Sequence, residues 1–316
     1  MSGATPALSD YPELAQIVNL ISSENPLQRK RINAFLVRQD PGYWQFAEEL
    51  SRTLNRAFLR TEQDRIAAAR SYNRTCMDLL REQIRFRRVG TYLLQDAQVA
   101  QETVYSQDAV MRYYVVGLLL SYLFWPNHYE IFRFFQEHVG RISINRCLEV
   151  GAGHGLFTAE VLHRVPGARL TLVDISETSI ELVREMLVTF GIESSRVEFI
   201  RGDYLESVLP TGNFEFIIMG EVLEHVNDAP RFLSLSRELL RPGGTLFLST
   251  CVNCPAVDHV YHFHKVGEIQ DLIAAAGLSV VRELTLPAEA VPKERWEEEL
   301  VTINYCGILA REGTDA

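Results

Sequence analysis

The sequence predicts an α/β protein in which an all-helical N-terminal domain precedes a doubly wound, mostly parallel sheet of seven strands. Two patterns support this fold class. Apolar residues recur at helical spacing through residues 10–140. From about residue 145, short strand-like runs alternate with segments of helical periodicity, which is typical of a parallel sheet with helices on both faces. We therefore place a helical cap domain at residues 1–140 and the sheet domain at residues 141–316.

The helical domain is predicted from apolar periodicity and from turn signals. Residues 43–60, for example, follow an Asp-Pro-Gly turn signal and carry apolar residues on one helical face. Pro126 interrupts the last pair of helices, and we place Asn127 as the N-cap of the second of them. The predicted helices cover residues 12–22, 26–38, 43–60, 62–86, 108–124 and 128–139.

Seven short runs in the second half predict the strands. Two late runs, residues 279–286 and 301–309, lie close together and predict an antiparallel hairpin at the edge of the sheet. The five earlier runs predict the parallel strands and cover residues 146–150, 169–173, 197–200, 214–219 and 245–250.

Composition and charge narrow the classes of partner. The chain of 316 residues is 47% hydrophobic and has a formal charge of −10. Residues 1–145 carry 17 Lys and Arg against 15 Asp and Glu, which leaves 14 and 26 for residues 146–316. So acidic a sheet domain argues against a nucleic-acid partner. No apolar run reaches the roughly 20 residues of a membrane-spanning helix, and no signal peptide is visible. We expect a cytoplasmic protein with a small-molecule partner and no membrane association, and we leave a homodimer open.

The five cysteines are scattered through the chain, which is typical of reduced thiols. Cys251 and Cys254 have the spacing of a redox or zinc half-site, but no second such pair follows. We interpret them as structural thiols, with a redox or zinc role as the alternative.

A glycine-rich loop, Gly151-Ala-Gly153-His-Gly155, follows the first predicted strand and opens a helix. Glycines let a backbone turn sharply and approach a ligand, and the helix N-terminus favours a carboxylate or phosphate. Asp174 ends the second strand nineteen positions later. An acidic side chain there can accept hydrogen bonds from both hydroxyls of a ribose.

The third and fourth predicted strands also end in candidate binding residues. Asp203 and Tyr204 follow the third strand, where a carboxylate can accept from an adenine amino group. Gly220 and Glu221 end the fourth strand. In a doubly wound sheet all these strand ends lie along one ligand-binding edge.

Together these motifs resemble the class I S-adenosylmethionine-dependent methyltransferases, over roughly residues 130–310. The loop has the pattern Gly-x-Gly-x-Gly, whereas most nicotinamide enzymes have Gly-x-Gly-x-x-Gly. The resemblance implies a Rossmann-like sheet that binds S-adenosylmethionine. A nicotinamide dehydrogenase and a non-catalytic binding protein are the competing classes. The residues that the motifs and the resemblance assign to the cofactor are Glu149, Gly151, Gly153, Gly155, Asp174, Ile175, Asp203, Tyr204, Gly220 and Glu221.

A second motif, Glu221-Val-Leu-Glu224-His225, resembles a stretch in ubiquinone-pathway O-methyltransferases and small-RNA 3′-end methyltransferases. The resemblance implies that these side chains can bind a divalent metal there. At positions i, i+3 and i+4 they would share one helical face. The same string also occurs in methyltransferases without metal, with Glu224 and His225 organising a loop. We favour no metal and keep this set as the alternative.

Acceptor recognition is predicted to come from the helical domain and from the segment after the fifth strand. In the resembled fold, extra N-terminal helices fold over the cofactor, and aromatic faces attract a sulfonium cation. We single out Tyr72, Asn73, Tyr113 and Tyr114 there. His259 lies in a histidine-rich segment at the ligand edge of the sheet and is our candidate general base.

The predicted activity is methylation of a small-molecule biosynthetic metabolite by direct displacement at the sulfonium methyl. We expect this metabolite to belong to secondary metabolism. Such a reaction depends mainly on positioning and needs a base only if the acceptor arrives protonated. The alternative keeps the fold and changes the chemistry. Azetidine-2-carboxylate synthases of similar fold cyclise S-adenosylmethionine itself and release methylthioadenosine.

Overall fold

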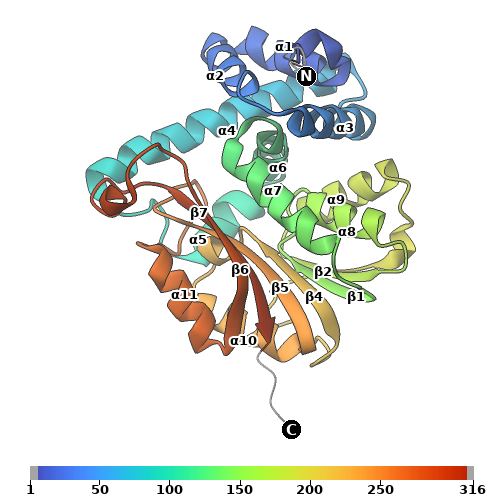
Figure 1. The fold of residues 1–316 in the computed structure, drawn as a ribbon, viewed down its shortest axis with the longest axis vertical. Helices are drawn as coiled ribbons and strands as arrows, with labels where there is room; N and C mark the ends of the chain where they lie inside the picture. Colours follow the sequence, from blue (N-terminus) through green and yellow to red (C-terminus); the bar gives the residue numbers. More distant parts are fainter. Residues whose placement is uncertain (1–5, 312–316) are drawn as a thin grey trace, which may run out of the picture.

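Seven strands form one sheet in the computed structural model, which describes residues 6–311 (Figure 1). The strand order is β3-β2-β1-β4-β5-β7-β6. The strands are β1 (Arg146–Val150), β2 (Arg169–Asp174), β3 (Val197–Arg201), β4 (Phe214–Gly220), β5 (Leu240–Val252), β6 (Leu278–Pro287) and β7 (Ile303–Arg311). Strands β1 to β5 run parallel, which confirms the doubly wound prediction, and the order reverses between β1 and β4. Ligands bind at such a reversal, beyond the carboxyl ends of the strands.

The two late strands pair antiparallel as predicted, but only β6 lies at the edge of the sheet. Strand β7 inserts between β5 and β6 and pairs antiparallel with both. Residues 303–309 are all buried, whereas residues 280–283 of β6 are exposed. The near-continuous burial of β7 is what an interior strand requires.

The predicted helices are all present, with ends displaced by a few residues. A short element that the sequence analysis missed, α5 with a π-helical turn at Gln101–Tyr105, links α4 to α6. The helices are α1 (Pro12–Glu24), α2 (Pro26–Leu36), α3 (Pro41–Ala57), α4 (Glu62–Val89), α5 (Ala97–Ala100), α6 (Asp108–Phe124), α7 (Pro126–Val139), α8 (Leu156–Arg164), α9 (Glu177–Thr189), α10 (Ala229–Leu239) and α11 (Val266–Ala275).

The prediction of Asn127 as an N-cap is wrong. Helix α7 begins at Pro126, with Trp125 at the N-cap position. Proline suits the first helical position because its fixed φ is already helical and its missing N–H would have no partner there. The amide of Asn127 instead donates to the backbone oxygen of Leu286 and to Asn304 Oδ1, both at 3.0 Å.

Alternating residues of each central strand pack on opposite faces of the sheet. In β4, Phe216 and Ile218 join the core beneath α7 and α8, whereas Ile217 and Met219 join the core beneath α10 and α11. This separation follows from the period of two along a strand. The glycine loop and the other strand ends are therefore held between two packed helical layers (Figure 1).

One apolar core joins the N-terminal helices to the sheet. It extends from Leu14 in α1 to Ile308 in β7. Phe135 of α7 packs against Phe157 and Phe247, with ring centroids 4.7 and 4.9 Å away. The division at residue 140 stays a prediction, because α7 packs directly on the sheet. No single helix in residues 6–311 is long and apolar enough to cross a membrane, and α6 and α7, which pass that test only as a pair, are bent by 83°.

Candidate functional site

A cavity of about 910 Å³ lies at the carboxyl ends of the parallel strands. The loops after β1 to β5 form one wall. The opposite wall comes from α5, the π-helical turn, α6 and the start of α7. The volume is near the upper end of the roughly 300–1,000 Å³ of small-molecule sites. The helical region therefore covers the edge of the sheet at which the sequence motifs converge.

The glycine loop adopts a backbone that favours glycine at three positions. Gly151, Gly153 and Gly155 have φ of 66°, 51° and 75°. Gly151 and Gly153 line the cavity, whereas Gly155 does not. A Cβ on Gly155 would lie 2.9 Å from Val183 Cγ2, so this glycine permits the close approach of α8 and α9. Its assignment to the methionine part of a cofactor is corrected to a packing role.

Asp174 faces the cavity from the end of β2 and is held by the backbone. Its Oδ1 accepts from the Ser176 N–H at 2.8 Å, and its Oδ2 accepts from the Gly153 N–H at 3.3 Å. Burial raises the pKa of this carboxyl to about 6, although the backbone hydrogen bonds oppose the shift. Such fixed donors leave the remaining lone pairs in a set orientation toward the cavity.

Three further predicted residues line the same wall, namely Ile175, Asp203 and Tyr204. The hydroxyl of Tyr204 is turned away toward α10, where it lies 2.9 Å from Ser236 Oγ. Any contact of Tyr204 with a ligand therefore comes from its backbone or ring rather than from its hydroxyl.

Glu149 lies behind the glycine loop and not on the cavity surface. Its carboxylate accepts a hydrogen bond from the Thr158 hydroxyl in α8. Burial raises its pKa to about 8. The assignment of Glu149 to direct cofactor contact is therefore not supported by this geometry, because the side chain points into the packing between β1 and α8.

Gly220 and Glu221 line the cavity at the end of β4. A Cβ on Gly220 would lie 2.7 Å from the Phe157 ring. Glu221 has a φ of 54°, which is strained for a residue with a side chain. Its Oε2 accepts from Asn304 Nδ2 at 3.4 Å, and its buried Oε1 has no hydrogen-bond partner among residues 6–311. Strained, under-satisfied residues of this kind cluster at functional sites.

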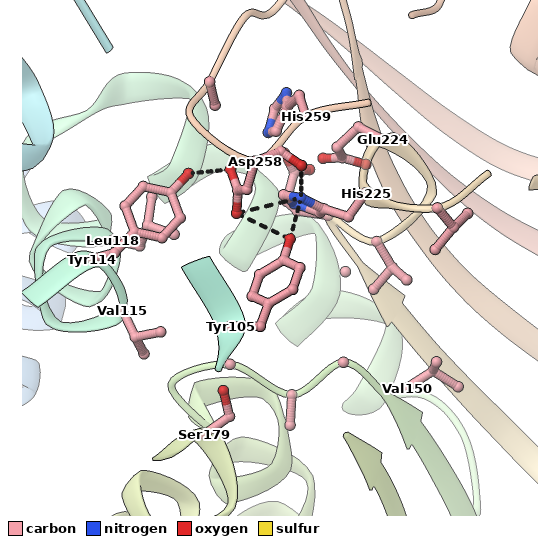
Figure 2. A pocket seen from close by; sticks show the side chains of 18 of the residues that line it. Tyr105, Tyr114, Val115, Leu118, Val150, Ser179, Glu224, His225, Asp258 and His259 are labelled. Atoms are coloured by element: carbon pink, nitrogen blue, oxygen red, sulfur yellow. Dashed lines mark hydrogen bonds and ion pairs between the residues drawn. The ribbon is translucent and has the colours of Figure 1, made fainter. Parts of the chain in front are cut away.

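The helical region and the sheet domain meet in a polar network inside the cavity. Figure 2 shows Tyr105 and Tyr114 directed at Asp258, with His225 beside them. Tyr105 donates to Asp258 Oδ2 at 3.1 Å, and Tyr114 donates to Asp258 Oδ1 at 3.0 Å. His225 Nδ1 lies 2.8 Å from the Tyr105 oxygen and 3.4 Å from Asp258 Oδ2.

The proton positions in this network follow from its acceptors. Because Tyr105 donates to the carboxylate, its oxygen accepts from His225 Nδ1–H. The lone pair of the imidazole then lies on Nε2. A histidine oriented through one nitrogen by a carboxylate, with the other nitrogen basic, is the arrangement of a general base. Tyr105 and Asp258 were not predicted from the sequence. Their only signal was the position of Asp258 at the start of the histidine-rich segment.

His259, our predicted base, also lines the cavity but is poorly suited to that role. The ring is 7% exposed, and its Nδ1 lies 2.5 Å from the backbone oxygen of Cys254. Burial lowers its pKa to about 4. So low a pKa makes the neutral ring a weak proton acceptor, so His225 replaces His259 as the candidate base.

Three of the four residues predicted in the helical domain lie outside the cavity. Tyr72 is buried between helices and accepts from Trp125 Nε1 at 3.0 Å. Asn73 donates to the backbone oxygen of Ile21, and Tyr113 donates to Asp78. Only Tyr114 faces the cavity. One residue along a helix turns a side chain by about 100°, so Tyr113 and Tyr114 point to different surroundings.

The metal set kept as an alternative, Glu221, Glu224 and His225, does not form on a helical face. Glu221 lies in the left-handed region, and only Leu223–His225 make a short 3-10 turn. In residues 6–311 no candidate ligand cluster contains all three side chains. Glu224 is fully buried and accepts from Thr250 Oγ1 at 2.7 Å. This correction follows from the strained backbone at Glu221, which breaks the i, i+3, i+4 geometry.

The similarity of this chain to known protein sequences lies in its sheet domain. Residues 148–248 match the family model of a methyltransferase domain. A ubiquinone biosynthesis O-methyltransferase of Xanthomonas oryzae pv. oryzae is 36% identical over 113 residues, which are 35% of this chain and 45% of that protein. The mitochondrial enzyme of the same name from Schizosaccharomyces pombe is 36% identical over 108 residues, 34% of this chain and 38% of that protein. The matches thus span less than half of these relatives.

Two solved structures share the fold at low identity. The cyclase SpnF has a TM-score of 0.53 and 15% identity, and the match covers 71% of this chain and 98% of SpnF. The mitomycin 7-O-methyltransferase MmcR has a TM-score of 0.50 and 17% identity, with 79% of this chain and 71% of MmcR covered. With the glycine loop, Asp174 and the strand order in place, the match over residues 148–248 shows that this chain carries a methyltransferase domain, and the solved structures share its fold.

Proposed function

We propose that this protein transfers the methyl group of S-adenosylmethionine to a hydroxyl of a small molecule bound in the cavity. The observation that carries the proposal is the His225–Asp258 pair, which lines the same cavity as the glycine loop and Asp174. A hydroxyl arrives protonated and becomes a good nucleophile only when its proton is removed. A positioned base beside a cofactor site is what such an acceptor requires.

The cofactor part of the cavity suits S-adenosylmethionine. Asp174 has the charge and the fixed orientation to accept from both ribose hydroxyls. Gly151 and Gly153 present bare backbone, and α8 begins directly beyond the loop, where its N-terminus favours a carboxylate. The cofactor supplies an electrophilic methyl group on a sulfonium centre. Residues of the chain supply alignment and exclude water.

On the acceptor side, His225 Nε2 would take the hydroxyl proton while Asp258 stabilises the imidazolium. The two tyrosine hydroxyls hold Asp258 in place, because each donates to a different carboxylate oxygen. Tyr105 and Tyr114 come from the helical region, so this region both closes the cavity and orients the base. The O-methyltransferase relatives in ubiquinone biosynthesis support a hydroxyl as the acceptor group.

The acidic lining supports a small, uncharged or cationic acceptor. Asp174, Asp203 and Asp258 line the cavity with Glu221 and Glu224, and burial raises the pKa of the two glutamates. Clustered carboxylates repel phosphate groups and nucleic-acid backbones. The volume of about 910 Å³ leaves room for an acceptor beside the cofactor.

The product formed from S-adenosylmethionine tests this proposal. The purified chain is incubated with the cofactor alone, and then with catechols, phenols and primary alcohols in turn, with products separated by mass spectrometry. We expect S-adenosylhomocysteine to form only in the presence of a hydroxyl acceptor. Methylthioadenosine released without any acceptor would overturn methyl transfer and favour cyclisation of the cofactor. Titration calorimetry that detects binding of NADH and not of S-adenosylhomocysteine would reject the cofactor assignment itself.

A further inference from the structure

We propose that Cys251, Cys254 and His259 bind a zinc ion in the wall of the cavity. One donor atom from each of the three side chains lies within 4.8 Å of the other two. Cys251 is the last residue but one of β5, and the other two residues lie in the loop that follows. Cys251 and His259 are buried, while Cys254 is half-buried. Two other possible ligand clusters, Glu224–His225–His259 and Glu221–Glu224–Cys251, share His259 and Cys251 with it.

The donor set is the one that zinc prefers. Two thiolates and one imidazole are typical zinc ligands, and the two cysteines have the C-x-x-C spacing of zinc sites. With Zn–S distances of about 2.3 Å, tetrahedral geometry places two sulfur ligands about 3.8 Å apart. The distances between the donor atoms, which are at most 4.8 Å without a metal, therefore need to shorten by roughly 1 Å. Two thiolates would also neutralise the charge of the ion.

The loop brings these donors together without a metal. His259 Nδ1 lies 3.8 Å from Cys251 Sγ and 2.5 Å from the backbone oxygen of Cys254. Since a backbone oxygen can only accept, Nδ1 carries the proton in the metal-free protein, and it must give up that proton and that hydrogen bond to bind zinc beside the sulfur atoms. The N–H of Cys254 donates to the Tyr92 hydroxyl at 2.9 Å, so the helical region also anchors the loop.

A second observation at the same place is a buried carboxylate without a cation. Glu224 has no exposed surface, and no salt bridge in residues 6–311 includes it. Its oxygens accept from Thr250 Oγ1 at 2.7 Å and from Cys251 Sγ at 3.8 Å. A Glu224 oxygen also lies within 4.8 Å of Cys251 Sγ in one of the possible ligand clusters, so Glu224 is positioned to complete the coordination.

The site would adjoin the reaction chamber. Cys254, His259 and Glu224 line the cavity, and the rings of His259 and His225 have centroids 4.7 Å apart. Structural zinc sites have four protein ligands, whereas sites with three protein ligands keep one position open. The geometry here provides three, so the fourth position would face Glu224 and the cavity.

The metal content of the full chain tests this inference directly and independently of activity. The protein is purified under reducing conditions without chelator, reconstituted with ZnCl₂, desalted and analysed by inductively coupled plasma mass spectrometry. We expect about one zinc per chain, and cobalt substitution should give a thiolate-to-cobalt charge-transfer band. Cys254→Ser and His259→Ala should each lose at least tenfold in zinc affinity. Cys76→Ser, which removes a thiol in α4, is the matched control and should keep the zinc.

Three results would overturn the proposal. One is a wild-type chain that keeps no stoichiometric zinc after reconstitution, with circular dichroism confirming that it is folded. A second is a Cys254→Ser variant that binds zinc as the wild type does, while Glu224→Gln loses it, which would move the ion to the carboxylates. The third is a count of three free thiols instead of five in the unreduced, denatured protein, which would indicate a Cys251–Cys254 disulfide.

Discussion

Replacement of Gly153 or Gly155 by alanine should damage this protein in two different ways, although both glycines belong to one loop. Both have positive φ, at 51° and 75°, and an alanine in that region costs about 1–2 kcal/mol. At Gly153 a new Cβ would have no atom within 4 Å. At Gly155 it would lie 2.9 Å from Val183 Cγ2 and 3.1 Å from Val183 Cα. The second contact is with backbone, which can retreat only if α9 moves.

The structure therefore predicts a larger loss of stability for one variant than for the other. Overpacking of a tight core contact adds about 1–3 kcal/mol. We expect Gly155→Ala to lower the free energy of unfolding by roughly 2–5 kcal/mol and Gly153→Ala by only about 1–2 kcal/mol. Cofactor affinity should rank the other way. Gly153 lines the cavity and Gly155 does not, so a methyl group on Gly153 enters space that the cofactor needs.

Two measurements on the same samples decide the matter. Urea denaturation followed by circular dichroism gives the free energy of unfolding, and titration calorimetry with S-adenosylhomocysteine gives the affinity of the folded protein. Equal losses of stability in the two variants would refute the packing argument for Gly155. Unchanged affinity in Gly153→Ala, with lost affinity in a folded Gly155→Ala, would show that the cofactor approaches the other side of the loop.

Burial raises the pKa of Asp174 to about 6, and only the carboxylate form can accept hydrogen bonds from both ribose hydroxyls. Cofactor affinity, measured by calorimetry, should therefore be constant above pH 6 and fall about tenfold per pH unit below it. Constant affinity down to pH 5 would contradict this role. His225→Gln should lower kcat roughly 10²- to 10⁴-fold with cofactor affinity unchanged, because glutamine cannot take a proton; a kcat within threefold of wild type would exclude His225 as the base. Tyr72→Phe should leave kcat unchanged and lower the free energy of unfolding by about 1 kcal/mol, because it removes the hydrogen-bond acceptor of the half-buried Trp125 N–H. A tenfold loss of kcat in a folded variant would return Tyr72 to the site.

Local signals were sufficient for the fold and for the cofactor edge of the sheet. Apolar periodicity located the long helices, and the glycine loop and Asp174 marked the ends of β1 and β2. Each of these signals lies within a few residues of the feature that it predicts. The parallel sheet then brings the strand ends together, because parallel strands share one carboxyl edge. The fold class was predictable for that reason.

The acceptor side depended on contacts between distant segments. Tyr105 and Asp258 are separated by 153 positions, and neither belongs to a recognisable motif. Tyr72 and Tyr113 looked equivalent to Tyr114 in composition, yet the packing of α4 and α6 turned only Tyr114 into the cavity. Helix rotation is set by the whole apolar core, so a short aromatic cluster cannot predict which ring faces a ligand.

Periodicity and strand-end motifs are local properties of the chain, so they were enough to predict a helical region followed by a doubly wound sheet with a nucleotide-type binding edge. Which side chains share the cavity depends instead on contacts between distant segments. The tertiary structure moved the candidate base from His259 to His225, placed Glu149 and Gly155 behind the loop, and brought Cys254 and His259 beside Cys251. The physical reason is that burial and orientation are set by long-range packing.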